Sequence, residues 1–321
     1  MKDTFMKSLE HYYIVVRRWI IRPILNNEKL SCFLSKHCLK TYLAMFYENW
    51  VGKCLNLRHP QDINHQLMRL SLDAYKDPIQ HKLRVQCADK YHVREYVKSK
   101  GFEDILIPSY GVFDNFDEID FSKLSNQFVI QSNFGCGHLW ICRDKEKELS
   151  NIDKWRKQFN EWMAIENFGR KTGEWQYNEI PPKLVITKYL DSLGAISVND
   201  YKFQCMNGQI YGCLVAYDRI PNVKHSVQLD HYDITWNLTN GIYESWHPKR
   251  RVIPKPTCYN RMLEIAQLLS KDFPYCRVDL YEAEGRVFFG ELTFTPQGNV
   301  MDYYTDSMLK DMLHFYNSTK K

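Results

Sequence analysis

The strongest constraint on the fold lies near the C-terminal end, in the segments YCRVDLY (275–281) and RVFFGELTF (286–294). Both are rich in β-branched and aromatic residues, and a short polar stretch containing Gly285 separates them. This pattern predicts an antiparallel β-hairpin. Because side chains alternate along a strand, Arg277 and Asp279 are expected on the same face of the first strand.

The hairpin brings two carboxylates together. We predict a three-residue turn over 283–285, with Gly285 in the left-handed conformation. This turn places Asp279 and Glu291 on one face of adjacent strands, whereas a two-residue turn would put them on opposite faces. Two carboxylates so close repel each other, so a cation is expected between them. Arg277 alone can supply that charge, and one or two magnesium ions are the alternative; spacing leaves both open.

Two more hairpins are predicted upstream, and residues 1 to about 85 are predicted to be mostly helical. The hairpin segments are FVIQ (128–131) and LWICR (139–143) around the turn NFGCGH (133–138), then DYKFQCM (200–206) and QIYGCLVAYD (209–218) around Asn207-Gly208. Antiparallel hairpins interspersed with helices indicate an α+β protein rather than a doubly wound parallel one.

Other candidate site residues carry weaker signals. Lys202 stands in a strand among apolar neighbours, so its ammonium group either reaches water or meets an anion. The glycines of NFGCGH could let backbone amides approach a phosphate, although the P-loop pattern GxxxxGK[ST] is absent and a plain hairpin turn is the alternative. The sequence contains neither GxSxG nor HExxH, so it shows no nucleophile elbow and no zincin motif.

Composition and charge narrow the partners and the compartment. The net charge is only +5 over 321 residues and the basic residues are dispersed, so no nucleic-acid partner is expected. The ten cysteines include no CxxC pair. We therefore expect free thiols in the reducing environment of the cytoplasm, without disulfides or a zinc site.

The segment HYYIVVRRWIIRPIL (11–25) carries most of the remaining apolar pattern. Arg17 and Arg18 interrupt it, so it is too short for a membrane span and unlike the core of a secretory signal. Its apolar residues recur at helical spacing: Phe5, Leu9, Tyr12, Val16, Ile20 and Ile24. That face either packs on the protein itself or makes a peripheral membrane contact together with its arginines.

Taken together, these residues resemble the TupA-like ATP-grasp family, named for teichuronopeptide biosynthesis and met in capsule and cell-envelope gene contexts. The resemblance runs from about residue 55 to about residue 302. It rests on LNLRHPQDIN, CADKYHVREYV (87–97), QFVIQSNFGCG, DYKFQCMNG and, above all, FPYCRVDLYEAEGRVFFGELTFTPQG (273–298). It implies two α+β subdomains whose antiparallel sheets clamp ATP. The expected division is a helical N-terminal region (1–87), a lid (88–185) and a metal-bearing core (186–321).

The resemblance also implies site residues. Asp279 and Glu291 match the metal ligands of the family, while Arg277 and Lys202 would contact phosphates or the acyl phosphate. The residues expected to bind the nucleotide are Lys90, Gln131, Gly135, Gly137, Lys188, Tyr189, Leu190 and Lys202. Arg219 is grouped with the catalytic residues, and His231 and Trp236 are expected beside it at the wall of the substrate site; packing within the loop is the alternative for these three residues.

This chain departs from the family pattern at three places. Gln131 stands where the family has a lysine; it can hydrogen-bond adenine or phosphate but brings no charge. Thr187 and Lys188 stand where the hinge usually carries acidic residues. Thr293 replaces an asparagine found in many ATP-grasp enzymes. Metal binding is therefore better supported than ordinary ATP affinity.

The activity implied by the resemblance is that of a Mg·ATP-dependent carboxylate–amine ligase, which forms an amide through an acyl phosphate. The expected substrates are a uronic acid of a capsular or cell-envelope glycan, or its sugar-nucleotide precursor, and an amino acid or simple amine. Two alternatives stay open. One is a metal-dependent glycosyltransferase, although 114–117 and 230–233 are DxxD rather than DxD. The other is a non-catalytic nucleotide-binding relative, prompted by Gln131 and Lys188.

Overall fold

The computed structural model describes residues 2–192, 195–220, 223 and 226–320. The N-terminal region is helical, as predicted: α1 (Lys2–Asn26), α2 (Glu28–His37), α3 (Leu39–Val51), α4 (Ile63–Lys76) and α5 (Pro78–Ala88). The side chains of Asn27, Asp62 and Asp77 accept hydrogen bonds from backbone amides at the starts of α2, α4 and α5. These caps explain why the chain breaks into separate helices at those points.

The first sheet, here the β1–β4 sheet, has the strand order β1-β4-β2-β3. Its strands are β1 (Ser109–Phe113), β2 (Phe128–Ser132), β3 (Leu139–Cys142) and β4 (Leu184–Lys188), and α7 (Lys145–Leu149) and α8 (Ile152–Met163) pack against it. Helices α6 (Val93–Ser99) and α9 (Phe168–Thr172) pack in the core of the second sheet instead. Trp155 of α8 stacks on Trp140 with ring centroids 4.8 Å apart. The aromatic face of α8 thus covers one side of this sheet.

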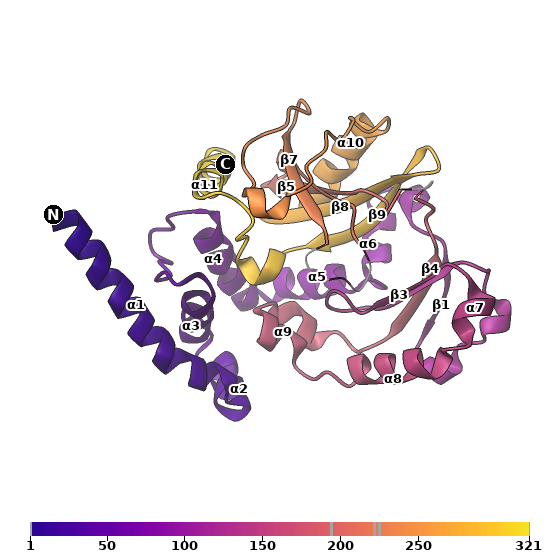
Figure 1. Cartoon of the computed structure of the whole chain (residues 1–321), viewed down its shortest axis with the longest axis horizontal. Coiled ribbons are helices and arrows are strands. Elements are labelled where there is room, and N and C mark those ends of the chain that lie inside the picture. The colour runs from indigo at the N-terminus through magenta and orange to yellow at the C-terminus, as the bar shows by residue number, and fades with distance from the viewer. Residues whose placement is uncertain (1, 193–194, 221–222, 224–225, 321) are drawn as a thin grey trace.

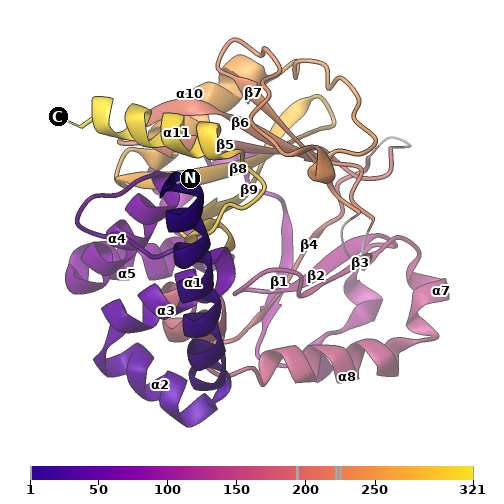
Figure 2. The same cartoon turned by 60° about the vertical axis from the view of Figure 1, so that its left-hand side comes forward.

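The second sheet, here the β5–β9 sheet, has the order β7-β6-β5-β8-β9. Its strands are β5 (Asp200–Met206), β6 (Gln209–Tyr217), β7 (Gln228–Asp233), β8 (Tyr275–Ala283) and β9 (Arg286–Thr293). Helix α10 (Tyr259–Ser270) packs on one face, and α4 and α11 (Asp306–Ser318) pack on the other. In both views this sheet lies above the β1–β4 sheet, and the N-terminal helices lie to one side (Figures 1 and 2).

The predicted α+β class is confirmed, because every strand pair within the described residues is antiparallel. The three predicted hairpins are β2–β3, β5–β6 and β8–β9. The exact division at residues 87 and 185 stays a prediction. All ten cysteines are free thiols in the structure. Among the described residues, none of the helices combines the length and the apolar character that crossing a membrane requires.

The turn of the last hairpin differs from the prediction. It consists of only Glu284 and Gly285, both with positive φ, 54° and 70°. A two-residue turn alone would have separated the carboxylates onto opposite faces. However, Gly290 forms a β-bulge, an extra residue in β9 that has no partner in β8. The bulge shifts the register by one residue, so Asp279 still pairs with Glu291. The predicted three-residue turn is wrong, and the predicted juxtaposition is confirmed.

Candidate active site

Asp279 lies at the centre of a buried charge cluster in the β5–β9 sheet. It pairs with Lys202 of β5 on one side and with Glu291 of β9 on the other, and its side chain is only 1% exposed. The Arg277 guanidinium donates to both Asp279 oxygens, from Nε and Nη2, at 2.7 Å each. The Lys202 ammonium contacts the Asp279 carboxylate and also lies 2.5 Å from Asp200 Oδ2. Of the two alternatives for Lys202, water or an anion, the structure shows an anion, which the chain itself supplies.

Arg277 also joins the two predicted metal ligands. Its Nη2 donates to Glu291 Oε1 and to Thr293 Oγ1, both at 3.0 Å. The Thr293 hydroxyl in turn donates to Glu291 Oε1 at 3.0 Å. The sequence allowed either Arg277 or magnesium between Asp279 and Glu291, and in this structure Arg277 lies between them. The metal-binding role of Asp279 and Glu291 stays a prediction.

The cluster sets the ionisation of its members. Burial by itself would raise the pKa of Asp279, but the charges of Arg277 and Lys202 outweigh it and hold that pKa below its ordinary value. Burial raises the pKa of Asp200, because Lys202 offsets the cost only in part and Asp279 adds a like charge. Burial opposes the charge of Arg277, yet Asp279 holds the pKa of this guanidinium well above its usual value. Arg277 and Asp279 thus stabilise each other as an ion pair.

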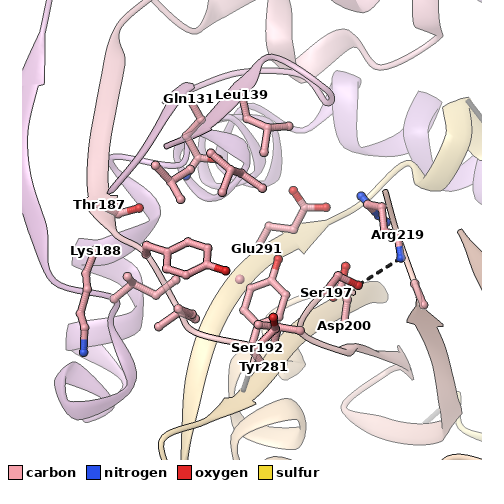
Figure 3. A pocket seen from close by; sticks show the side chains of 18 of the residues that line it. Gln131, Leu139, Thr187, Lys188, Ser192, Ser197, Asp200, Arg219, Tyr281 and Glu291 are labelled. Carbon is pink, nitrogen blue, oxygen red and sulfur yellow. Dashed lines mark hydrogen bonds between the residues drawn. The ribbon is translucent and has the colours of Figure 1, made fainter. Parts of the chain in front are cut away.

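A cavity of about 250 Å³ lies between the two sheets, next to this cluster (Figure 3). Val129, Leu139 and Ile141 give it an apolar wall from the β1–β4 sheet. The opposite side is polar and comes from Asp200, Tyr281 and Glu291 of the β5–β9 sheet, together with Arg219. An apolar half and a charged half fit a ligand with a flat apolar ring at one end and negative charge at the other.

The sequence-predicted residues divide into two groups around this cavity. Those that line it are Lys90, Gln131, Lys188, Tyr189, Leu190, Arg219 and Glu291. Arg277, Lys202 and Asp279 do not line it, but they reach it through Glu291 and Asp200. Gly135 and Gly137 also lie outside the lining, in the β2–β3 turn, with φ of 68° and 78°. Lys90 Nζ donates to the carbonyl oxygen of Gly135 at 2.6 Å and so links this turn to the cavity.

The hinge after β4 presents its backbone, and not its charge, to the cavity. The Lys188 side chain points away from the cavity in Figure 3, and its Nζ lies 2.6 Å from Glu284 Oε1 of the β8–β9 turn. Tyr189 and Leu190 line the cavity, and within the described chain their backbone groups form no backbone hydrogen bond. These N–H and C=O groups are therefore available to a ligand.

Asp200 was not identified from the sequence. Its carboxylate lines the cavity, and its buried Oδ1 has no hydrogen-bond partner among the described residues. The available signal was its spacing, because Asp200 lies two residues before Lys202 and so on the same face of β5. An unpaired buried carboxylate oxygen at a cavity marks a position where a ligand donor fits.

The other two residues expected at the substrate wall lie elsewhere. His231 borders a separate groove with Tyr211 and Asp311 at the β7 side of the sheet. Trp236 stacks on Tyr232 with ring centroids 4.5 Å apart, and its Nε1 donates to a backbone carbonyl at 3.1 Å. Packing within the loop, the alternative for Trp236, is therefore what the structure shows.

Several solved ligase structures resemble this chain at low identity. D-alanine–D-alanine ligase from Bacillus anthracis, complexed with ATP, is 16% identical with a TM-score of 0.44; the match covers 73% of this chain and 63% of that one. Phosphoribosylamine–glycine ligase from Thermotoga maritima is also 16% identical, with a TM-score of 0.42 and coverage of 74% and 56%. The chain thus spans less than two thirds of the length of either protein.

A comparison with curated proteins gave no match. The family model described as TupA-like ATPgrasp, in contrast, matches residues 68–314, which include both sheets, the cavity and the charge cluster. The family suggested by the sequence motifs is confirmed by this match. The chain belongs to the TupA-like ATP-grasp family.

Proposed function

We propose that this chain is a Mg·ATP-dependent carboxylate–amine ligase that forms an amide through an acyl phosphate. The observation that carries the proposal is the Arg277–Asp279–Glu291 cluster, which adjoins an inter-sheet cavity in a member of an ATP-grasp family. Two antiparallel sheets around one cavity also suit the expected clamp of a lid over a core. A nucleotide-sugar transferase is less suitable, because its DxD pair usually stands on a parallel sheet and none is described here.

The cavity supports ATP as the nucleotide. The apolar wall of Val129, Leu139 and Ile141 suits a stacked purine ring, and the hinge backbone at Tyr189 and Leu190 can pair with its edge. Gln131 lies in the same cavity and can hydrogen-bond the nucleotide without adding charge. Because the Lys188 ammonium faces Glu284, the unusual hinge lysine does not place a positive charge against the ring.

The two carboxylates Asp279 and Glu291 suit magnesium when phosphate oxygens provide further ligands. Asp279 and Glu291 would hold the ion, and the Glu291 side chain is 34% exposed, so it is accessible from the cavity. Nowhere in the described chain do three acidic, histidine or cysteine side chains gather as metal ligands. Magnesium commonly uses one or two carboxylates and takes its other ligands from phosphates and water. When bound, it neutralises charge on the transferred phosphoryl group.

The chain's own residues have separable roles in this proposal. Arg277 and Lys202 place two fixed positive charges beside the phosphate end of the cavity, where they stabilise developing negative charge. Arg219 is suited to hold the carboxylate substrate, since it lines the charged side of the cavity. The unpaired Oδ1 of Asp200 is suited to accept a hydrogen bond from the incoming amine. Binding of metal by Asp279 requires Arg277 to release at least one of its oxygens.

The substrates are proposed from the family resemblance. The carboxylate would be a uronic acid of a capsular or cell-envelope glycan or of its sugar-nucleotide precursor, and the amine would be an amino acid or a simple amine. Acyl phosphate formation requires the carboxylate to reach the γ-phosphate of ATP at the charged side of the cavity, with ADP as the leaving group. A screen of uronic acids with and without amines, followed by ADP release, identifies the pair.

The decisive variant is Glu291→Gln, with Glu146→Gln on α7 as the control, because Glu146 is exposed and does not line the cavity. We expect Mg·ATP to raise the stability of the wild type, by about 2.7 kcal/mol at a hundredfold excess over its Kd. Glu291→Gln should lose metal-dependent stabilisation and at least about a hundredfold in ADP formation, since a transition-state charge contact of this kind contributes roughly 3 kcal/mol. Glu146→Gln should lose neither.

Two results would overturn the ligase proposal. Stabilisation by UDP-sugars and not by Mg·ATP would point to a transferase. Stabilisation by Mg·ATP that is unchanged in Glu291→Gln, with no ADP formed by the wild type over the full substrate screen, would point to a non-catalytic relative.

A further inference from the structure

Helix α1 exposes an apolar stripe on the outer edge of the molecule. The exposed fractions of its large residues are 82% for Trp19, 56% for Ile20, 53% for Tyr13, 50% for Val15 and 43% for Val16. Their spacing of three and four residues places them on one side of the helix. Figures 1 and 2 show α1 along the outside of the N-terminal helices. The exposed stripe is therefore continuous and uncovered by the described chain.

The opposite side of α1 is fixed to the protein. Ile21 is 5% exposed, and Leu25 packs in the core formed with α3. Arg17 Nε lies 2.9 Å from the buried Glu48 carboxylate, and Arg22 Nε donates to Asn49 Oδ1 at 3.2 Å. The helix thus has a defined inner face, and the exposure of its outer face does not result from loose packing.

Positive charge is concentrated in the sequence segment that contains this stripe. Residues 11–47 contain six lysines and arginines and a single acidic residue, Glu28, which is paired with Arg170 at 3.1 Å. Their excess of positive charge equals the net charge of +5 of the whole chain, so the remaining residues are neutral as a set. On a helix wheel Arg18 and Arg22 border the stripe on one side and Arg17 borders it on the other.

We propose that α1 binds the surface of an anionic lipid bilayer, lying in the plane of the interface. Trp19 and Tyr13 are the side-chain types that favour the boundary between head groups and acyl chains. Arg18 is not part of the two contacts that tie Arg17 and Arg22 to α3, so its guanidinium can extend toward lipid phosphates while its stem stays on apolar surface. An apolar helix face bordered by cations is the pattern of helices that lie on a membrane.

The charge pattern favours lipid over a second copy of the chain. A symmetric dimer through α1 would bring the same basic surfaces face to face, and the like charges would repel. Lipid binding would also leave the cavity free, because α1 lies at one side of the molecule and the β1–β4 sheet at the other (Figure 1). The inference concerns a surface far from the cavity and does not rest on the ligase activity.

The test is vesicle flotation of the full chain. We expect the protein to float with vesicles of phosphatidylcholine and phosphatidylglycerol, to bind pure phosphatidylcholine much more weakly, and to be released by high salt. Trp19→Glu should lower the partition coefficient at least about tenfold, because it removes about 1.4 kcal/mol or more of apolar burial. Ile79→Glu is the matched control: its side chain on α5 is 79% exposed and the charge change is identical.

Three outcomes would overturn the proposal. The first is absence of binding to the anionic vesicles, and the second is equal loss of binding in both variants. The third is a dimer, seen by light scattering, that Trp19→Glu dissociates and Ile79→Glu does not, because a second copy would then cover the stripe. Unfolding midpoints of both variants, expected to match the wild type at such exposed positions, show that a loss of binding is not a loss of fold.

Discussion

His231 is a buried residue that can make the free energy of unfolding depend on pH. Its side chain is 2% exposed, its Nδ1 lies 3.0 Å from Thr239 Oγ1, and its Nε2 has no hydrogen-bond partner in the described chain. Burial lowers its pKa to about 4. His138, beside the β2–β3 turn, has a pKa lowered to about 4 as well, by burial and then by the charge of Lys90.

We predict that the free energy of unfolding falls as the pH drops from about 6.5 toward 4. In that window the unfolded chain takes up a proton on each of these histidines while the folded chain does not, so protonation favours unfolding. Each such group contributes a slope of up to about 1.4 kcal/mol per pH unit. His231→Asn should make the dependence of unfolding free energy on pH shallower in urea titrations. The exposed His314→Asn on α11 should not, and an unchanged slope in His231→Asn would contradict the assignment.

At this scale the sequence predicted what strand alternation determines. Arg277 and Asp279 share one face because successive side chains alternate along β8, and the structure brings them into contact. Lys202 joins them because β5 pairs with β8 opposite Asp279, and strand alternation alone does not predict that pairing. The pairing of Lys188 with Glu284 could not be predicted in this way. The hinge and the β8–β9 turn are distant in the sequence and meet only in the folded structure, so no local pattern predicts that contact.

The β8–β9 hairpin shows how a single bulge decides the site. Gly290 has no partner in β8, and a Cβ added to it would lie 2.9 Å from the Asp279 carbonyl oxygen and 3.0 Å from Tyr281 Cε2. The sequence predicted the facing carboxylates through an extra residue placed in the turn, whereas the extra residue is Gly290 in β9. Strand alternation counts residues and cannot show which one is extra. Gly290 could have indicated the bulge, since a lone glycine inside a strand pattern often marks one.

We predict that Gly290→Ala lowers the free energy of unfolding by about 1–3 kcal/mol, because the new methyl group forces the backbone of β8 and β9 apart. The same displacement moves Glu291 relative to Asp279, so stabilisation by Mg·ATP should fall as well. The control is Gly285→Asn in the turn, where nothing lies within 4 Å of the added Cβ and asparagine tolerates the positive φ of 70°. Equal stability losses in both variants would show that the bulge is not special.

The fold class could be predicted from the local hairpin patterns. The position of the N-terminal helices against the rest of the protein could not. Tyr42 donates its hydroxyl to the backbone carbonyl of Arg170 at 2.8 Å, and α3 and α4 share a core with Trp175 and Val300. The first helices thus pack on segments from both later parts of the chain. Their contacts join residues more than a hundred positions apart in the sequence. The spacing of apolar residues therefore predicts that the helices form but not where they pack.

This arrangement predicts that the N-terminal helices influence stability without altering the cavity. Arg17 is the ion-pair partner of Glu48, whose side chain is only 3% exposed. Arg17→Met leaves that carboxylate buried without its cation, so we expect the free energy of unfolding to fall by about 1–3 kcal/mol. The Kd for Mg·ATP should stay within about twofold of the wild type, because no residue of α1 lines the cavity.

The double variant Arg17→Met/Glu48→Gln separates a lost charge contact from lost packing. If the buried charge is the cause, neutralising Glu48 should recover part of the stability, since a neutral amide costs less to bury than an unpaired carboxylate. Urea unfolding gives the coupling energy between the two residues, and calorimetric titration gives the affinity for Mg·ATP in the same samples. A double variant no more stable than Arg17→Met would assign the loss to the arginine stem. A large change in Kd would instead mean that the helical region acts on the cavity from a distance.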